Sequence, residues 1–201
     1  TATPIPRTLA MTVYADLDTS IIDELPPGRT PITTIAISED RRADIIERVN
    51  RACTEEKRQA YWVCTLIDES EVLEAQAAEA VAEDLRKILP HLRIGLVHGR
   101  MKPAEKQEIM QEFKDANLDL LVATTVIEVG VDVPNASLMI IENAERLGLS
   151  QLHQLRGRVG RGTTASFCVL MYKPPLGKIS QKRLQVMRDT QDGFVISEKD
   201  L

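Results

Sequence analysis

Three arginines alternate with glycines in the stretch HQLRGRVGRG, which spans residues 153–162. Arg156, Arg158 and Arg161 carry planar guanidinium groups, whose donor geometry matches the oxygens of a phosphate. The intervening glycines let the backbone turn tightly or approach a ligand closely. These residue types predict a phosphate-binding loop. They leave open whether the phosphate belongs to a nucleotide or to a nucleic-acid backbone, and they assign no separate role to Arg156.

The basic residues gather around this loop although the chain as a whole is acidic. The 201 residues have a formal net charge of −5, yet the segment from Arg146 to Arg188 contains nine lysines and arginines and no aspartate or glutamate. A basic run of this length is typical of a nucleic-acid-binding surface. The alternative is a solvated basic face without a ligand, and the setting of the arginines among glycines favours binding.

A second candidate site is the loop HGRM at residues 98–101. It joins an expected strand to a helix that begins near Pro103, and the free backbone N–H groups at a helix N-terminus can bind a phosphate. Arg100 and Lys102 would add positive charge there. An ordinary turn between a strand and a helix explains the same residues equally well.

A third candidate is the segment ATTVIEVGVDVPNA at residues 123–136. Thr124 ends an expected strand, and Gly130 permits the close approach of a ligand. Asp132 could accept a hydrogen bond from a ribose hydroxyl. By composition alone, a core strand that runs into a turn is the favoured interpretation of this segment.

Several familiar catalytic patterns are absent from the sequence. It contains no GxxxxGK[ST] phosphate loop, no acidic box after an apolar strand, no HExxH or GxSxG motif and no paired cysteine ligands. The glycines of residues 157–162 are also spaced wrongly for the GxGxxG fingerprint of a dinucleotide site, which argues against an oxidoreductase. We therefore expect that the chain contributes phosphate contacts but does not hydrolyse a nucleotide unaided.

The elements that must position these loops alternate between strands and helices. Apolar or β-branched runs predict the strands, and helical spacing of apolar residues predicts the helices between them. The expected strands are 33–37, 61–66, 93–98, 119–124, 137–143 and 166–172, and the expected helices are 38–58, 71–89, 103–116, 150–157 and 180–188. This order indicates an α/β fold, with a parallel sheet flanked by helices on both faces.

Prolines divide the chain into three expected parts. The sequence PPGRTP at residues 26–31 is a stiff connector, because each proline fixes its own φ angle. Residues 1–30 are then the tail of a preceding domain with its linker, 31–172 the main domain, and 173–201 the start of a helical extension. The chain begins without a methionine inside a patterned segment, so we expect a fragment of a longer protein.

The composition also narrows the cellular setting. The apolar runs are too short to span a bilayer, and no signal-peptide core opens the chain. Cys53, Cys64 and Cys168 have neither zinc-binding nor redox spacing. We expect a cytoplasmic location, no membrane partner and no metal site within these residues.

Five segments occur in an order that resembles the superfamily 2 helicases. QLRGRVGR at 154–161 matches the QxxGRxGR box of motif VI, ATTVIEVGVD at 123–132 matches motif V, and TATPIPRTL at 1–9 resembles motif III. VCTLID at 63–68 and HGRM at 98–101 fall where motif IV and its neighbour belong. Together with DELPPGRTP, these segments resemble the RecG-type bacterial ATP-dependent DNA helicases. A duplex translocase of the Mfd type and a non-catalytic nucleic-acid-binding module are the alternatives.

The resemblance implies a RecA-like fold and a nucleotide-binding role for five residues. Arg158 and Arg161 would act as arginine fingers on the γ-phosphate of ATP, and Gln154 would help to couple the nucleotide and DNA states. Gly130 and Asp132 would approach the ribose. ATP and Mg²⁺ would be the cofactors of the full-length protein, bound mainly by a first motor domain that precedes this chain.

The remaining matches imply contacts with DNA. The residues implied are Thr65, Thr124 and the loop of His98, Gly99 and Arg100, which would follow a DNA strand by its phosphates, and Arg188 in the helical extension. That extension would begin an element that couples hydrolysis to translocation. The implied partners are branched DNA, such as forks and Holliday junctions, and the N-terminal domains of the same chain. We expect a monomer that acts in branch migration and replication-fork reversal.

Overall fold

A computed structural model describes residues 31–65, 70–124 and 133–190 of the chain. The predicted ribose contacts Gly130 and Asp132 and the segment resembling motif III lie outside these residues. The strands are β1 (Ile32–Ser38), β2 (Gln59–Cys64), β3 (Ile94–Val97), β4 (Leu120–Thr124), β5 (Ala136–Ile141) and β6 (Ser166–Tyr172). The helices are α2 (Arg42–Thr54), α3 (Glu71–Ile88), α4 (Pro103–Lys114), α5 (Leu149–Arg156) and α6 (Lys178–Asp189), with short 3-10 helices η1 (Glu39–Arg41) and η2 (Ala144–Arg146).

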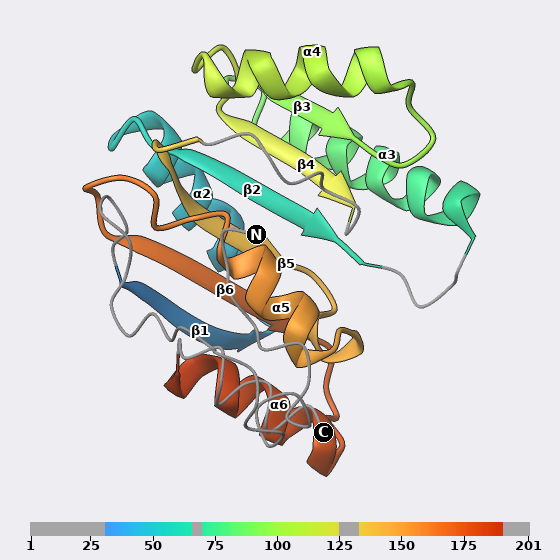
Figure 1. The fold of residues 1–201 in the computed structure, drawn as a ribbon, viewed down its shortest axis with the longest axis vertical. Helices are drawn as coiled ribbons and strands as arrows, with labels where there is room; N and C mark the ends of the chain where they lie inside the picture. Colours follow the sequence, from blue (N-terminus) through green and yellow to red (C-terminus); the bar gives the residue numbers. More distant parts are fainter. Residues whose placement is uncertain (1–30, 66–69, 125–132, 191–201) are drawn as a thin grey trace, which may run out of the picture.

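The six strands form one sheet in the order β1-β6-β5-β2-β4-β3, and every neighbouring pair is parallel. Parallel strands need a crossover between them, and α2, α3, α4 and α5 supply it after β1, β2, β3 and β5, respectively (Figure 1). The predicted α/β fold with a parallel sheet is confirmed. Each expected strand has a counterpart in the structure, with bounds that differ by a few residues at most.

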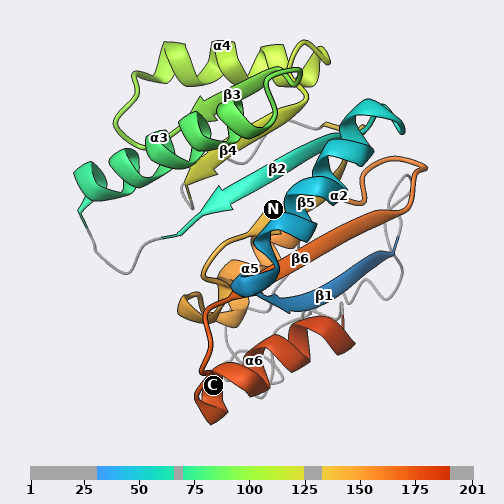
Figure 2. The ribbon, with the colours of Figure 1, turned by 180° about the vertical axis from the view of Figure 1, so that it is seen from behind.

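Helices cover both faces of the sheet, as Figures 1 and 2 show from opposite sides. Side chains of α4, α5 and α6 share one apolar cluster with Tyr61 and Val63 of β2. Side chains of α2 and α3 share a second cluster with Trp62 of β2 on the other face. This alternation along β2 follows from the two-residue period of a strand, and it explains why the strands read as continuous apolar runs.

Two element boundaries differ from the sequence expectation for physical reasons. Strand β2 begins at Gln59, whose buried side-chain amide donates to the backbone carbonyl of Leu118 at 2.8 Å. A polar side chain can enter the sheet because that hydrogen bond satisfies it. The expected helix over 38–58 instead divides into η1 and α2, and it ends before Lys57, which adopts a left-handed φ of 56°.

Candidate functional site

Three of the predicted DNA contacts lie at one edge of the sheet. Thr65 follows β2, His98 follows β3 and Thr124 ends β4. These strands are neighbours in the order β2-β4-β3, and parallel strands end at the same edge. Open parallel sheets bind ligands at this carboxyl edge. The structure therefore brings together residues that lie up to 59 positions apart along the chain.

The two threonine side chains at this edge are buried. Both residues are 2% exposed. The Thr65 hydroxyl donates to the backbone carbonyl of Glu142 at 2.6 Å, so Thr65 ties the end of β2 to the end of β5. The Thr124 hydroxyl has no hydrogen-bond partner within the described part of the chain. The two threonines thus differ: one hydroxyl is used within the fold, and the other leaves a buried polar group unsatisfied.

A pair of charged residues that we had not singled out reinforces the same edge. Arg42 donates to the carboxylate of Glu142, and its guanidinium group lies 5.2 Å from the centre of the Trp62 ring. Glu142 is only 8% exposed and directly follows β5. Asn143 then adopts a left-handed φ of 50°, which turns the chain from β5 into η2. The signal that could have found this site is an acidic residue that directly follows an apolar strand.

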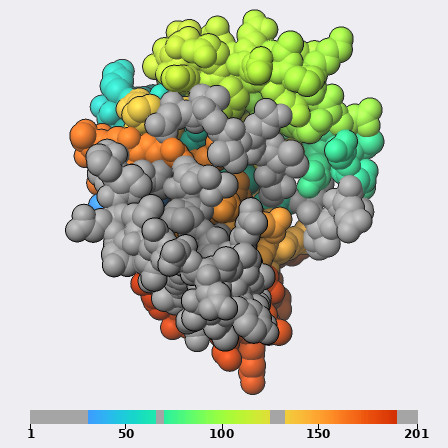
Figure 3. Space-filling model, viewed as in Figure 1, coloured from blue at the N-terminus to red at the C-terminus, as the bar shows by residue number. Residues whose placement is uncertain are grey.

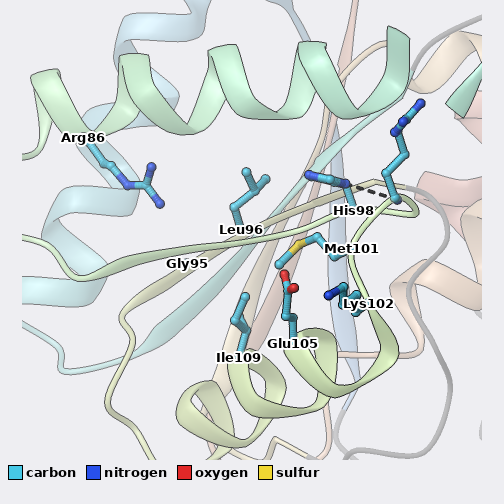
Figure 4. A pocket seen from close by; sticks show the side chains of 9 residues that line it. Arg86, Gly95, Leu96, His98, Met101, Lys102, Glu105 and Ile109 are labelled. Carbon is cyan, nitrogen blue, oxygen red and sulfur yellow. Dashed lines mark hydrogen bonds between the residues drawn. The ribbon is translucent and has the colours of Figure 1, made fainter. Parts of the chain in front are cut away.

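The loop from His98 to Lys102 forms a tight turn ahead of α4. The N–H of Met101 donates to the carbonyl of His98 at 3.2 Å. A Cβ atom built on Gly99 would meet no other atom within 4 Å, so this side of the turn is open. The loop borders a cavity of about 570 Å³, which is also lined by Arg86 of α3 and Glu105 of α4 (Figure 4).

The arginine-rich turn follows α5, and its two predicted fingers are neighbours. Arg158 is 7% exposed, and Arg161 is half-buried with its Nε donating to the carbonyl of Gly157 at 3.0 Å. Burial lowers the pKa of the Arg158 guanidinium, the Tyr61 hydroxyl raises it, and the positive charge of Arg161 lowers it further. Arginine stays protonated in spite of such shifts, so two cations lie close together here. This arrangement favours an anionic ligand.

Two glycines shape this turn. Gly160 has a φ of 77°, a left-handed conformation that strains any residue with a Cβ atom. A Cβ atom on Gly162 would lie 2.5 Å from the carbonyl oxygen of Pro134. The chain just after the segment 125–132 therefore packs directly against the arginine-rich turn. The remaining predicted nucleotide contacts, Gly130 and Asp132, belong to that segment and lie outside the described residues.

Arg156 braces the fold. It is 2% exposed, and its guanidinium donates to the hydroxyl of Thr34 in β1 at 3.2 Å and to the carbonyl of Met187 in α6. It also donates to Nδ1 of His153 at 3.3 Å. Burial lowers the pKa of this guanidinium, and the Cys168 thiol raises it. One side chain therefore joins α5 to a strand and to a second helix.

The two other predicted site residues lie apart from the carboxyl edge near β3. Gln154 is half-buried on α5, one turn before Arg158. Arg188 is exposed near the end of α6, with its Nε 3.4 Å from the carboxylate of Asp189. Helix α6 packs against β1, which is the opposite end of the sheet from β3. The structure does not bring Arg188 together with the His98–Lys102 loop.

Residues 31–65, 70–124 and 133–190 lack two features, a metal-binding cluster and a membrane-spanning helix. No three of their histidine, cysteine, aspartate or glutamate side chains lie close enough together to hold a metal ion. None of their helices has the length and apolar character needed to cross a membrane.

Residues 40–163 match the family described as the helicase conserved C-terminal domain. The chain belongs to this family. Three relatives are named ATP-dependent DNA helicase RecG. The relative from Pasteurella multocida (strain Pm70) is 92% identical to this helicase domain, the one from Haemophilus influenzae (strain ATCC 51907 / DSM 11121 / KW20 / Rd) is 86% identical, and the one from Escherichia coli (strain K12) is 76% identical. Each match covers the whole chain and 29% of the relative, so the chain spans less than a third of these proteins.

Solved structures agree with this assignment of the helicase domain. The structure of RecG bound to a three-way DNA junction is 43% identical with a TM-score of 0.80, over 98% of this chain and 26% of that chain. Domain 2 of the Mss116p DEAD-box helicase, bound to an RNA duplex, has a TM-score of 0.60 at 15% identity, over 81% of this chain and 62% of that chain. The latter is a likeness of fold alone. The predicted RecA-like fold and the resemblance to RecG-type helicases are confirmed.

Proposed function

We propose that this domain is the C-terminal motor domain of an ATP-dependent DNA helicase that acts in branch migration and replication-fork reversal. The observation that carries the proposal is the 92% identity to a RecG helicase across the whole chain. The neighbouring arginines Arg158 and Arg161 support it, because a motor of this kind needs cations at the phosphate that is transferred. We further propose a cytoplasmic monomer.

In the proposed ATP site, this domain supplies the arginine fingers and a preceding motor domain supplies the phosphate cradle. ATP, bound with Mg²⁺, provides the phosphoryl group that is transferred to water. Arg161 is the more exposed finger and reaches the γ-phosphate, while Arg158 adds positive charge from behind it. Their charges stabilise the negative charge that develops on the phosphate oxygens.

The other predicted nucleotide contacts complete this proposal. Gly130 and Asp132 contact the ribose, and Gln154 on α5 couples the nucleotide state to the DNA state. The Mg²⁺ ion is assigned to the preceding domain together with the phosphate cradle, since the sequence of this chain has neither a GxxxxGK[ST] loop nor an acidic box after an apolar strand.

The proposed DNA-binding surface is the carboxyl edge at β2, β4 and β3. Arg100 and the open side of Gly99 contact phosphates of one DNA strand. Thr124 is assigned to the same strand, and its hydroxyl, which is unsatisfied but buried in this structure, must become accessible to donate to it. Thr65 contributes by holding the ends of β2 and β5 together, since its hydroxyl is already used. Arg188 adds a contact from α6 at the other end of the sheet.

Strand release from a labelled three-way junction tests this function. We expect the full-length protein to release a strand when ATP is present, because translocation needs hydrolysis to drive it. Replacing ATP by an analogue that cannot be hydrolysed should leave the junction bound and intact. A linear duplex of equal length is the matched control substrate. Equal release with the analogue, or no release with ATP, would exclude an ATP-driven helicase.

A further inference from the structure

The His98 side chain has both of its ring nitrogens engaged within the domain. Nδ1 accepts a hydrogen bond from the backbone N–H of Arg100 at 3.2 Å, which Figure 4 shows as a dashed line. Nε2 lies 3.3 Å from a carboxylate oxygen of Glu79, which comes from α3. Because a backbone N–H can only donate, the ring proton lies on Nε2 and faces Glu79. The His98 ring is therefore not placed to donate to a DNA phosphate itself.

These contacts fix the turn from two sides. His98 is 8% exposed, so solvent does not compete strongly for its two hydrogen bonds. Its carbonyl accepts from Met101, and its ring accepts from Arg100, so two consecutive N–H groups of the turn are bound by a single residue. Glu79 is largely exposed and anchors the far side of the ring to α3. The turn is thus held in one shape, while the side of Gly99 that faces away stays open.

We propose that His98 is a positioning residue, which holds the 98–102 turn in the shape that lets Arg100 meet a DNA phosphate. This inference rests on the proposed DNA-binding role of the loop. It changes the role predicted for His98 from direct contact to support. A turn that is already held in its binding conformation has less backbone freedom to lose when Arg100 binds a phosphate, and this lowers the cost of binding.

Two substitutions separate the contact made by Nδ1 of the His98 ring from the contact made by Nε2. Asparagine places an oxygen near the position of Nδ1, so His98→Asn keeps the acceptor for the N–H of Arg100 and loses the contact with Glu79. Glutamine reaches the position of Nε2, so His98→Gln keeps the contact with Glu79 and loses the acceptor. His91→Gln is the matched control, because His91 lies before β3, at the opposite end of that strand, where its ring contacts the exposed Asn50 side chain.

Affinity for a three-way junction, measured in the full-length protein over a series of salt concentrations, tests the proposal. We expect His98→Gln to weaken binding about 3- to 10-fold, the fold-change of one lost hydrogen bond, and His98→Asn to bind close to wild type. Arg100→Ala should weaken binding and reduce the salt slope by about one phosphate contact. The double variant His98→Gln with Arg100→Ala should bind no more weakly than Arg100→Ala, because both changes remove the same contact.

Each alternative result is decisive. Equal weakening by His98→Asn and His98→Gln would overturn the role of Nδ1, and additive losses in the double variant would show that His98 acts independently of Arg100. Thermal melting distinguishes a loss of DNA affinity from a loss of folding, because the variants should have the same melting temperature as the wild-type protein. An unchanged affinity of Arg100→Ala would instead remove the proposed DNA contact of the loop, and the positioning role with it, while leaving the proposed ATP site intact.

Discussion

Replacing Arg161 by alanine in the full-length protein is expected to reduce DNA-stimulated ATP hydrolysis by about three orders of magnitude or more, the usual effect of losing an arginine finger. Arg161 lies beside Arg158, yet it is the less buried of the two. It is therefore the cation that can reach across to a nucleotide held by another domain. Steady-state ATP turnover with saturating three-way junction measures the effect.

Two comparisons separate this loss from a general defect. Affinity of the Arg161→Ala protein for the junction should stay within about twofold of wild type, because the finger contacts the nucleotide and not DNA. Arg51→Ala removes an exposed arginine from α2, on the face of the sheet away from α5, and should hydrolyse ATP normally. Undiminished ATP turnover by Arg161→Ala would refute the finger assignment.

Replacing Arg156 by methionine is expected to lower the free energy of unfolding by about 2–4 kcal/mol. Methionine fills much of the space but donates no hydrogen bond. The carbonyl of Met187 and Nδ1 of His153 then lose the donor that the structure gives them, in surroundings where little water reaches them. Urea unfolding of the 201-residue chain, followed by circular dichroism, measures the change.

Arg188→Met is the matched control for this substitution. It changes the same residue type on α6, but Arg188 is exposed and pairs with its equally exposed neighbour Asp189. An exposed ion pair of this kind contributes at most about 1 kcal/mol. Equal stability losses in Arg156→Met and Arg188→Met would contradict the bracing role of Arg156.

Much of the fold could be predicted because a parallel sheet buries its strands on both faces. Strands Leu120–Thr124 and Ala136–Ile141 are buried along their whole length. Strands buried on both faces appear in the sequence as continuous apolar runs, which is why they could be recognised. The start of β2 at Gln59 was not predicted, because a polar residue does not indicate a buried strand. Its side chain is polar, and only the carbonyls of Phe113 and Leu118, more than 50 residues away, allow it to be buried.

The candidate site could be predicted only in part. Glycine and arginine spacing indicates the turn at 157–162 because the chemistry lies in neighbouring residues. The position of Glu142 directly after an apolar strand is visible in the sequence, but its partner Arg42 lies 100 positions away, so no local pattern predicts the ion pair itself. For the same reason the sequence could not distinguish the internal hydroxyl of Thr65 from the unsatisfied hydroxyl of Thr124.

ATP turnover by the 201-residue chain alone, compared with turnover by the full-length protein, tests most directly the claim that this domain supplies only one side of an ATP site. The chain contains the arginine-rich turn but no GxxxxGK[ST] loop. We predict no hydrolysis by the chain alone, with or without three-way junction DNA, and only weak ATP binding by calorimetric titration. The full-length protein should hydrolyse ATP, and the junction should stimulate it. Hydrolysis by the chain alone, or micromolar ATP binding to it, would contradict the account.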